Sequence, residues 1–505
     1  MPPPNRGAPT PPIALSTEAG SVRSHFRASV VEVSDGQLAR LRGVCDDVTT
    51  DVAIRAEGGR DWWPLAMGWA LDGEVPGLAG AVARPREVDE VAGVLAVCNE
   101  AHLPVTTAAG RSGVCGASVP VHGGVLLDMC ALTGIVDVDD ASLVLDVRAG
   151  TFGDLLEDDL RSHHGVTLGH WPQSINLSTV GGWLACRSAG QYSTRYGKIE
   201  DMVAGLQVVL ADGRVVRTGG APRAAVGPDL TQVFVGSEGT LGVITEAWLR
   251  VHPVPIHERR AAFGFSSFTD GLEACRRVLR RGATPAVLRL YDTAESQRNF
   301  EVTDHHVLLV LDEGDAAVVD AVMKIVDEEC EGATTRLDEA LVERWMEHRN
   351  DVSALEALTQ RRVVVDTVEI AARWAALPAI YDGVLAAVSA LEHALVVSAH
   401  QSHAYTDGAC LYFTFAGRPP DEDGAAGRDA FYLAAWDAAT HVVLSHGGAL
   451  SHHHGIGLNR SRFVRDALGP ALDVLVALKA ALDPHAILNP GKLGLPDPFG
   501  ELDWP

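Results

Sequence analysis

The sequence predicts an α+β protein built from two lobes. Its 505 residues exceed the size of one typical core, and 47% of them are hydrophobic, so the chain can fill two cores. Short apolar segments alternate with single helical patterns between residues 78 and 256, and Pro253 and Pro255 end that series. We therefore expect a first lobe over residues 31–256 and a second over residues 257–450.

The two ends of the chain differ from these lobes. Residues 1–30 begin with a proline-rich stretch without an apolar core, so we expect a flexible arm and neither a signal peptide nor a membrane helix. No run of eighteen apolar residues occurs, which predicts that the protein has no integral membrane segment. Residues 451–505 form a separate C-terminal segment that opens on consecutive histidines.

The elements of the first lobe follow from periodicity. A helix is predicted to begin at Pro85, because apolar residues then recur at spacings of three and four. The recurring residues are Val88, Val91, Leu95 and Cys98. Strands are expected at residues 124–128, 142–147, 206–210 and 243–251.

The second lobe is predicted to contain strands with intervening helices. A helix is expected near residues 270–281, and a helical pattern follows Gly455. Strands are expected at residues 261–265, 287–291, 306–311 and 363–371, and a hairpin-like pair at residues 394–400 and 409–415.

Three glycine-rich segments stand out, at residues 106–117, 172–183 and 236–245. Glycine permits positive φ and a close approach of the backbone to a ligand, and the neighbouring hydroxyls can meet phosphate. None of the segments has the spacing of a Rossmann turn or a phosphate loop. Successive backbone N–H groups from such segments can nevertheless hold a pyrophosphate. Ordinary turns that need glycine remain the alternative.

Charge and cysteine content restrict the class of partner. The net charge of −25 argues against nucleic acid and anionic membranes as general partners, because a negative field repels phosphates. The eight cysteines show no C-x-x-C spacing. They are therefore expected to be free thiols in a reducing compartment, which indicates a cytoplasmic protein.

The histidines 452–454 are the sharpest chemical signal after the glycine-rich segments. In an extended segment, His452 and His454 would share one face and His453 would take the other. General acid/base chemistry or phosphate binding in a cleft suits imidazoles near neutral pH. A metal site and exposed chance histidines remain alternatives. We assign no metal ligand, because no cysteine or carboxylate stands nearby at ligand spacing.

Four further polar residues have two interpretations each. Tyr412 is either a core aromatic or an acid/base group. Arg289 and Arg349 are either solvated charges or guanidinium forks for a phosphate or carboxylate. Glu369 lies in a strand-like run, where burial would require a partner, and we expect one of these arginines to be that partner.

Several motifs carry a resemblance to a known family. The three glycine-rich segments resemble, in their order, the FAD-binding domain of the vanillyl-alcohol oxidase/p-cresol methylhydroxylase (PCMH) superfamily. More specific motifs are similar to its alkylglycerone-phosphate synthase (alkyl-dihydroxyacetonephosphate synthase) branch. They lie at residues 169–174, 196–201, 227–229, 405–413 and 451–455. The resemblance extends from about residue 85 to residue 493.

The resemblance implies a fold and a cofactor. The fold is a two-lobed α+β arrangement, with an FAD-binding PCMH-type domain and a substrate (cap) domain that has an antiparallel sheet and flanking helices. The C-terminal segment would complete the active site and return to the FAD lobe. The residues expected to bind FAD are Ala109, Gly110, Arg111, Ser112, Gly113, Gly116, Ala117, Pro172, Ser174, Ser178, Thr179, Gly181, Gly182, Glu238, Gly239, Gly242, Val243 and Ile244.

The resemblance also implies site roles. In the synthase branch, the residue matching Tyr412 is the catalytic acid/base, and the triple histidine lies beside it in the active site. Arg349 matches an arginine of that branch implicated in substrate binding, and Arg289 matches another essential arginine. Arg111 stands where relatives with covalent FAD often have a histidine, so noncovalent FAD is expected, and Cys115 is interpreted as a small loop residue.

Two enzyme functions and one further class follow. Like the synthase, the protein would use flavin N5 chemistry with a Tyr/His acid-base set on a small substrate that bears phosphate or carboxylate. Alternatively, it oxidises a 2-hydroxy acid or alcohol by hydride transfer to FAD. The short segment 295–315 favours the second function and puts a long-chain lipid substrate in doubt, whereas Tyr412, Arg349 and the histidines favour the first. A non-catalytic flavin- or metal-binding protein, and assembly as a homodimer, are further alternatives.

Overall fold

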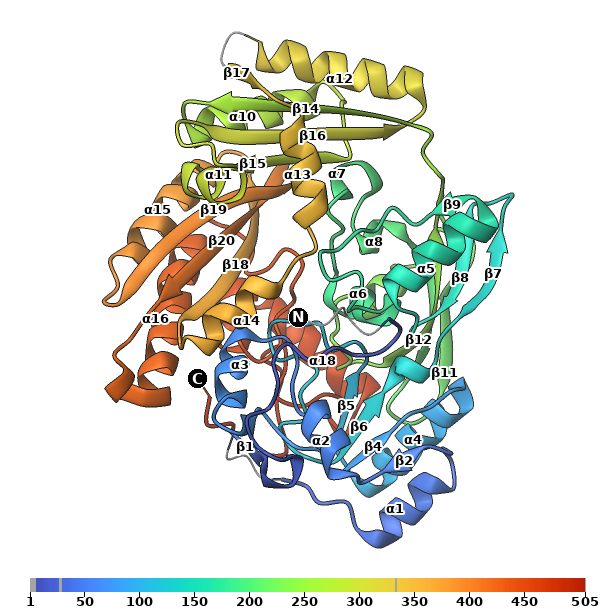
Figure 1. Cartoon of the computed structure of the whole chain (residues 1–505). Coiled ribbons are helices and arrows are strands. Elements are labelled where there is room, and N and C mark those ends of the chain that lie inside the picture. The colour runs from blue at the N-terminus through green and yellow to red at the C-terminus, as the bar shows by residue number, and fades with distance from the viewer. Residues whose placement is uncertain (1–5, 27–29, 332–333, 505) are drawn as a thin grey trace.

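The structure is a computed structural model that describes residues 6–26, 30–331 and 334–504. Figure 1 shows one lobe built mainly from the blue and green parts of the chain and a second built from the yellow and orange parts. The red C-terminal part, including α18 (Ala471–Leu482), lies against the first lobe. None of the helices in the described residues is both long and apolar enough to cross a membrane.

The first lobe contains two main sheets. One is four-stranded in the order β2-β4-β6-β5, and α4 (Val88–Ala101) joins two of its parallel strands by a crossover. The other is five-stranded and antiparallel in the order β11-β10-β12-β8-β7. The strands are β2 (Val48–Thr49), β4 (Ala81–Ala83), β5 (Val105–Ala108), β6 (Val125–Asp128), β7 (Ile135–Asp139), β8 (Val144–Arg148), β10 (Val203–Val209), β11 (Val215–Gly219) and β12 (Val243–Arg250).

The second lobe is built on one seven-stranded antiparallel sheet, in the order β17-β14-β16-β15-β19-β20-β18. The expected hairpin-like pair is confirmed as the neighbouring strands β19 and β20. The strands are β14 (His257–Phe265), β15 (Val287–Tyr291), β16 (His306–Gly314), β17 (Thr334–Leu337), β18 (Val364–Arg373), β19 (Ala394–Ala404) and β20 (Gly408–Gly417).

Alternation along these strands gives the sheet two different faces. Leu288 and Leu290 pack in the core beneath α10 (Phe268–Arg280) and α12 (Ala316–Cys330). The alternate residues of the same strand, Val287, Arg289 and Tyr291, therefore point to the opposite face. That face carries α11 (Thr293–Phe300) and α13 (Ala340–His348), and it is turned toward the first lobe.

Two expectations differ from the structure at the N-terminal side. The helix expected from Pro85 begins instead at Val88, because Glu87 forms a capping box with Glu90. Residues 6–26, expected as part of a flexible arm, fold onto the first lobe. Ile13, Val22 and Phe26 are buried there, and β1 (Arg23–Ser24) pairs with β3 (Glu74–Val75). Residues 1–5 of the expected arm, and residues 27–29, lie outside the described residues.

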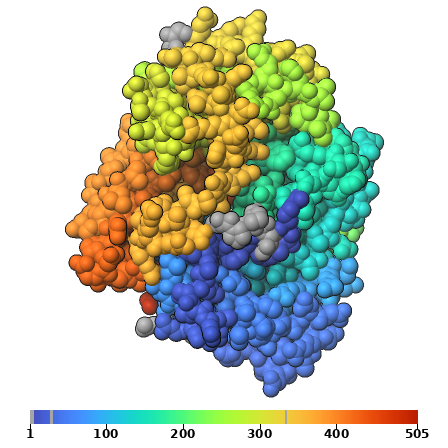
Figure 2. All heavy atoms as spheres, in the orientation of Figure 1, coloured from blue at the N-terminus to red at the C-terminus, as the bar shows by residue number. Residues whose placement is uncertain are grey.

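The lobes are in direct contact, as Figure 2 shows from the outside. Arg195 pairs with Asp312 at 2.7 Å, and the Tyr196 hydroxyl donates to Glu313 at 2.7 Å. The C-terminal segment adds a further tie, because the Asn489 N–H donates to the Val105 carbonyl at 2.7 Å. The first two contacts join the second lobe to the first, and the third joins the C-terminal segment to the first lobe.

Candidate functional site

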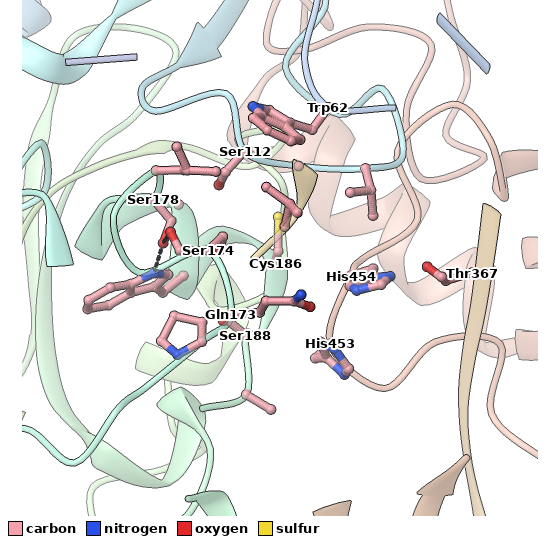
Figure 3. Close-up of a pocket in the computed structure, with 18 of the residues that line it drawn as sticks. Trp62, Ser112, Gln173, Ser174, Ser178, Cys186, Ser188, Thr367, His453 and His454 are labelled. Carbon is pink, nitrogen blue, oxygen red and sulfur yellow. Dashed lines mark hydrogen bonds between the residues drawn. The ribbon is translucent and has the colours of Figure 1, made fainter. Parts of the chain in front are cut away.

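A cavity of about 850 Å³ lies where the two lobes meet. Its walls combine all three glycine-rich segments with the inner face of the seven-stranded sheet. Figure 3 shows Ser112, Ser174 and Ser178 on one side of this cavity and His453 and His454 on the other. The volume lies in the range of small-molecule and cofactor sites.

The glycine-rich segments meet one another at this wall. A β-carbon on Gly110 would lie 2.1 Å from the Leu177 carbonyl oxygen, so only glycine lets the first and second segments touch. A β-carbon on Gly239 would lie 3.4 Å from Thr107, and Gly239 has φ +73°. The residues expected to bind FAD line the cavity with one exception. Gly116 packs against the Trp63 ring instead, and it is absent from the wall.

Unpartnered polar atoms make this wall suitable for a dinucleotide. Thr107 Oγ1 and Ser118 Oγ are buried at the cavity and have no hydrogen-bond partner among the described residues. A buried hydroxyl without a partner costs free energy, which a bound ligand would recover. Together with the bare glycine backbone, these groups fit a flavin dinucleotide.

Tyr412 extends from β20 into the opposite wall. Its ring stacks on that of His400, with 4.9 Å between centroids, and meets the ring of His454 edge-on at 5.6 Å. Burial raises the pKa of Tyr412 above its usual range, although a hydrogen bond with Thr367 opposes the shift. The phenol is therefore protonated at neutral pH and can donate a proton.

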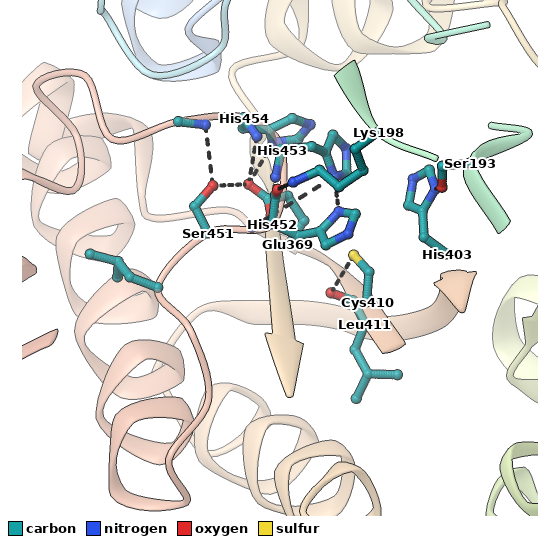
Figure 4. A network of polar contacts seen from close by, with 12 residues as sticks. Ser193, Lys198, Glu369, His403, Cys410, Leu411, Ser451, His452, His453 and His454 are labelled. Carbon is teal, nitrogen blue, oxygen red and sulfur yellow. Dashed lines mark hydrogen bonds and ion pairs between the residues drawn. The ribbon is translucent and has the colours of Figure 1, made fainter. Parts of the chain in front are cut away.

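The triple histidine forms a turn around a carboxylate, which corrects the expected extended segment. The carboxylate of Glu369, which is 0% exposed on β18, accepts hydrogen bonds from the backbone N–H groups of all three histidines. It also accepts from Ser451 Oγ at 2.8 Å (Figure 4). As a result His453 and His454 both line the cavity, whereas His452 lies behind them.

The partner of Glu369 also differs from the expectation. Arg460, which is 0% exposed, donates to Glu369 at 2.8 Å, whereas Arg289 and Arg349 make no ion pair with it. Burial opposes ionisation of Glu369, but Arg460 and the neighbouring histidines outweigh it and hold the pKa well below its usual range. An ionised carboxylate thus fixes the shape of the histidine turn.

A second layer of polar residues supports the histidines. His452 Nε2 contacts the Tyr405 hydroxyl at 2.9 Å, and the His403 ring stacks on His452 at 4.9 Å. Burial lowers the pKa of His452 to about 3 and of His454 to about 4, and it lowers that of His453 well below its usual range. These imidazoles are neutral near pH 7 and can accept protons.

Within the described residues, two groups of side chains have the spacing of metal ligands. Atoms of His403, His452 and His453 lie within 4.8 Å of one another, as do atoms of Glu369, Cys410 and His453. The second group is unsuited to a metal, because Glu369 already binds Arg460 and the turn amides. Neutral imidazoles suit zinc and similar ions, so the first group has the right ligand chemistry.

Arg289 and Arg349 lie together in the cavity wall, near the Trp345 ring. Arg289 is 8% exposed, and its guanidinium donates to Tyr291, Ser402 and His400. The half-buried Arg349 donates to Gln191 at 2.9 Å. Neither guanidinium has a carboxylate within 4.0 Å in the described part of the chain. Buried cations without counter-ions make this wall suitable for an anion.

Sequence reasoning missed three residues of this wall. His400 follows from the hairpin, because it lies opposite Tyr412 in the register of β19 and β20. His403 reaches the cavity through a β-bulge between Gln401 and His403, which no local pattern reveals. Glu295 comes from α11 and is 1% exposed beside His400, and only the tertiary fold brings the two together.

Comparisons with known proteins match both lobes. Residues 79–219 match the FAD binding domain family, and residues 254–493 match the C-terminal domain of FAD linked oxidases. An uncharacterized FAD-linked oxidoreductase, YgcU, of Escherichia coli (strain K12) is 30% identical over 439 residues, which cover 82% of this chain and 89% of that protein.

Other relatives carry more specific names. The alkyldihydroxyacetonephosphate synthase of Dictyostelium discoideum is 30% identical, over 83% of this chain and 74% of that protein. The glycolate oxidase subunit GlcD of Bacillus subtilis (strain 168) is 28% identical, over 82% of this chain and 88% of that protein. A solved alkyldihydroxyacetonephosphate synthase structure superposes with a TM-score of 0.77 at 24% identity, covering 96% of this chain and 89% of that one, and shows the same fold.

Proposed function

Because the chain belongs to the family of FAD-linked oxidoreductases and is an FAD-dependent enzyme, we propose that its two-lobed cavity performs acid-base chemistry beside the flavin. Tyr412, His453 and His454 are the acid-base set. The substrate is a small molecule that bears a phosphate or carboxylate. This proposal follows the synthase-like relatives.

The glycine-rich wall holds FAD noncovalently. Bound there, FAD supplies N5 as its reactive atom. Two observations support the noncovalent mode. By the family resemblance, Arg111 stands where relatives with covalent FAD often have a histidine. Burial also raises the pKa of the Cys115 thiol well above its usual range, so no thiolate is available.

Tyr412 and the histidines move the proton. Tyr412 is a protonated phenol at neutral pH and donates to the substrate, while the neutral imidazoles of His453 and His454 accept a proton in return. His452 acts through the other two, since it lies behind them against Tyr405. Tyr412, His453 and His454 are all half-buried in the same cavity wall.

Arg289 and Arg349 bind the substrate anion. The observation that carries the proposal is that these guanidinium groups line the cavity that holds Tyr412 and the histidines, and that they have no carboxylate partner among the described residues. A phosphate or carboxylate would supply the missing counter-charge through charge-assisted hydrogen bonds. The anion would also orient the reacting carbon toward Tyr412.

The alternative function is oxidation of a 2-hydroxy acid. It is favoured by the glycolate oxidase subunit and the FAD-linked oxidoreductase among the relatives. The same residues would serve, with a histidine or Tyr412 taking the hydroxyl proton and the arginines holding the carboxylate.

Anaerobic mixing separates the two functions. The purified protein is mixed with 2-hydroxy acids in one series and with an acylated ketone phosphate plus a labelled carboxylate in another. Exchange of the label into the ketone phosphate supports the synthase-like reaction, whatever the change in the flavin absorbance band. Bleaching of the flavin absorbance band by a hydroxy acid supports oxidation instead. If no anionic substrate gave either response, both functions would be contradicted.

A further inference from the structure

His400 lies beside Arg289 in the wall of the cavity. It lies on β19, is 9% exposed and lines the cavity. Its ring is held between two tyrosines, with centroid distances of 5.1 Å to Tyr291 and 4.9 Å to Tyr412 and interplanar angles of 27° and 24°. Packing on both faces therefore fixes the plane of the imidazole.

The two ring nitrogens of His400 face opposite charges. Nδ1 lies 2.7 Å from Glu295 Oε2, and Nε2 lies 2.9 Å from an Arg289 nitrogen. A guanidinium has only donors, so Nε2 must be the acceptor, and the ring proton must lie on Nδ1 and be donated to Glu295. A doubly protonated ring would direct a donor at Arg289.

The charges on either side agree with this arrangement. Burial lowers the pKa of His400, although Glu295 opposes that shift. Burial would raise the pKa of Glu295, but the hydrogen bond from His400 and the charge of Arg298, which lies 3.0 Å away, oppose it, and the pKa is about 2. The hydrogen-bonded series Glu295–His400–Arg289 is thus compatible with one arrangement of protons, in which His400 is neutral.

We propose that His400 is a positioning residue whose neutral imidazole holds the Arg289 guanidinium in the cavity while keeping it apart from the Glu295 carboxylate. A carboxylate in direct contact would neutralise Arg289 before a substrate arrived. The imidazole instead fixes the direction of the guanidinium and leaves its charge available. This inference rests on the proposed function, in which Arg289 binds the substrate anion.

The first test determines which ring nitrogen of His400 carries the proton. The FAD-loaded protein is labelled with ¹⁵N histidine, and His400→Gln identifies the His400 signals by difference. The groups that face His400 are Glu295 and Arg298 on α11, Arg289 and Tyr291 on β15, and Tyr412 on β20. We expect a neutral ring protonated on Nδ1 at pH 7, with any titration of the ring below the ordinary pKa of histidine. An Nε2-protonated ring, or titration near its ordinary pKa, would overturn the proposal.

The second test measures anion binding at Arg289. The quantity measured is the dissociation constant of inorganic phosphate, determined by calorimetry on the FAD-loaded protein. His400→Phe keeps the ring and loses both nitrogens, whereas His400→Gln keeps an acceptor near the Nε2 position and loses the ring. We expect His400→Phe to weaken binding about tenfold, as for a lost hydrogen bond to a charged group, and His400→Gln to recover most of it. The opposite order, or equal losses, would contradict the proposal.

The two tests keep this inference separate from the proposed function. A wild-type protein that does not bind phosphate would contradict the anion site of the proposed function. The position of the His400 proton would still decide the inference in that case. FAD content and melting temperature, measured for both variants, show that each one is folded.

Discussion

At the scale of single residues, the cavity combines the Tyr412 phenol, neutral imidazoles and two guanidinium groups that have no carboxylate partner among the described residues. Each of these groups is costly to bury, and each is held by neighbours that come from other elements. Perturbed titratable groups gathered in one cleft are typical of an enzyme site rather than of a structural core.

Replacement of Tyr412 tests the acid-base role. Tyr412→Phe keeps the stacking on His400 and removes the hydroxyl, so we expect turnover to fall by about 10²- to 10⁴-fold with FAD content unchanged. Steady-state kinetics and the flavin absorbance of the same preparation measure both. If turnover stayed at the wild-type value, Tyr412 would have no role in proton transfer.

Replacement of Arg349 tests anion binding. Arg349→Met should raise KM about 10- to 100-fold and leave FAD content unchanged, because a charge-assisted contact with the substrate is lost. Arg349→Lys should restore little, since a lysine cannot stack as Arg349 does on Trp171, Tyr192 and Trp345.

A matched control for Arg349 is available in the same cavity. Arg344 also lines the cavity, but it pairs with Glu301 at 2.9 Å. Arg344→Met should therefore change KM by less than about threefold, as for a surface ion pair. An equal effect of the two substitutions would show that the absence of a counter-ion is not what matters.

At the scale of elements, the histidine turn depends on one strand. Glu369 on β18 binds the N–H groups of the turn on one side and Arg460 on the other. Hydrogen bonds to the Glu369 side chain therefore attach the turn to the sheet, although the turn is far from β18 in the sequence. A change at Glu369 should act on both stability and the placement of His453 and His454.

Glu369→Gln leaves Arg460 buried without its counter-ion. We expect the free energy of unfolding at pH 7 to fall by about 3–5 kcal/mol, as measured by urea denaturation. The surface variant Glu392→Gln, whose side chain is 89% exposed, should change it by less than about 0.5 kcal/mol.

The same variant has a defined pH dependence. The pKa of Glu369 is depressed in the folded protein, so its stabilising effect is present above the unfolded value of 4.5 and is lost as the pH falls toward the folded value. The difference in unfolding free energy between wild type and Glu369→Gln should therefore be constant above about pH 5 and shrink below it. A difference that grew on acidification would contradict the assigned ionisation.

Much of the fold followed from local pattern, because strands with strict alternation specify their own faces. Tyr412 lies among alternating Leu411, Phe413 and Phe415, and the structure places those three in the core and Tyr412 in the cavity. The glycine-rich segments were equally predictable, since their function is local backbone geometry.

The remaining parts of the site required tertiary contacts. The histidine motif was visible in the sequence, but its turn was not, because the carboxylate that shapes it comes from a distant strand. His403 depends on a bulge, and the link from Glu295 to His400 depends on packing of α11 against β19. Neither of these has a periodic signature.

At the scale of the whole molecule, the function depends on two lobes closing over one cofactor. The first lobe supplies the glycine-rich wall, and the second supplies Tyr412 and the arginines. The C-terminal segment supplies the histidines and then pairs with Val105 in the first lobe. Loss of FAD should therefore expose groups from all three parts of the chain.

The most direct measurement is the visible spectrum of the purified protein before and after acid precipitation. We expect a flavin spectrum, with all of the flavin released into the supernatant because no side chain is bonded to it. We also expect that protein stripped of flavin takes up added FAD. A colourless protein that does not take up FAD would contradict the assignment of the cavity as an FAD site, and flavin retained in the precipitate would contradict the noncovalent mode.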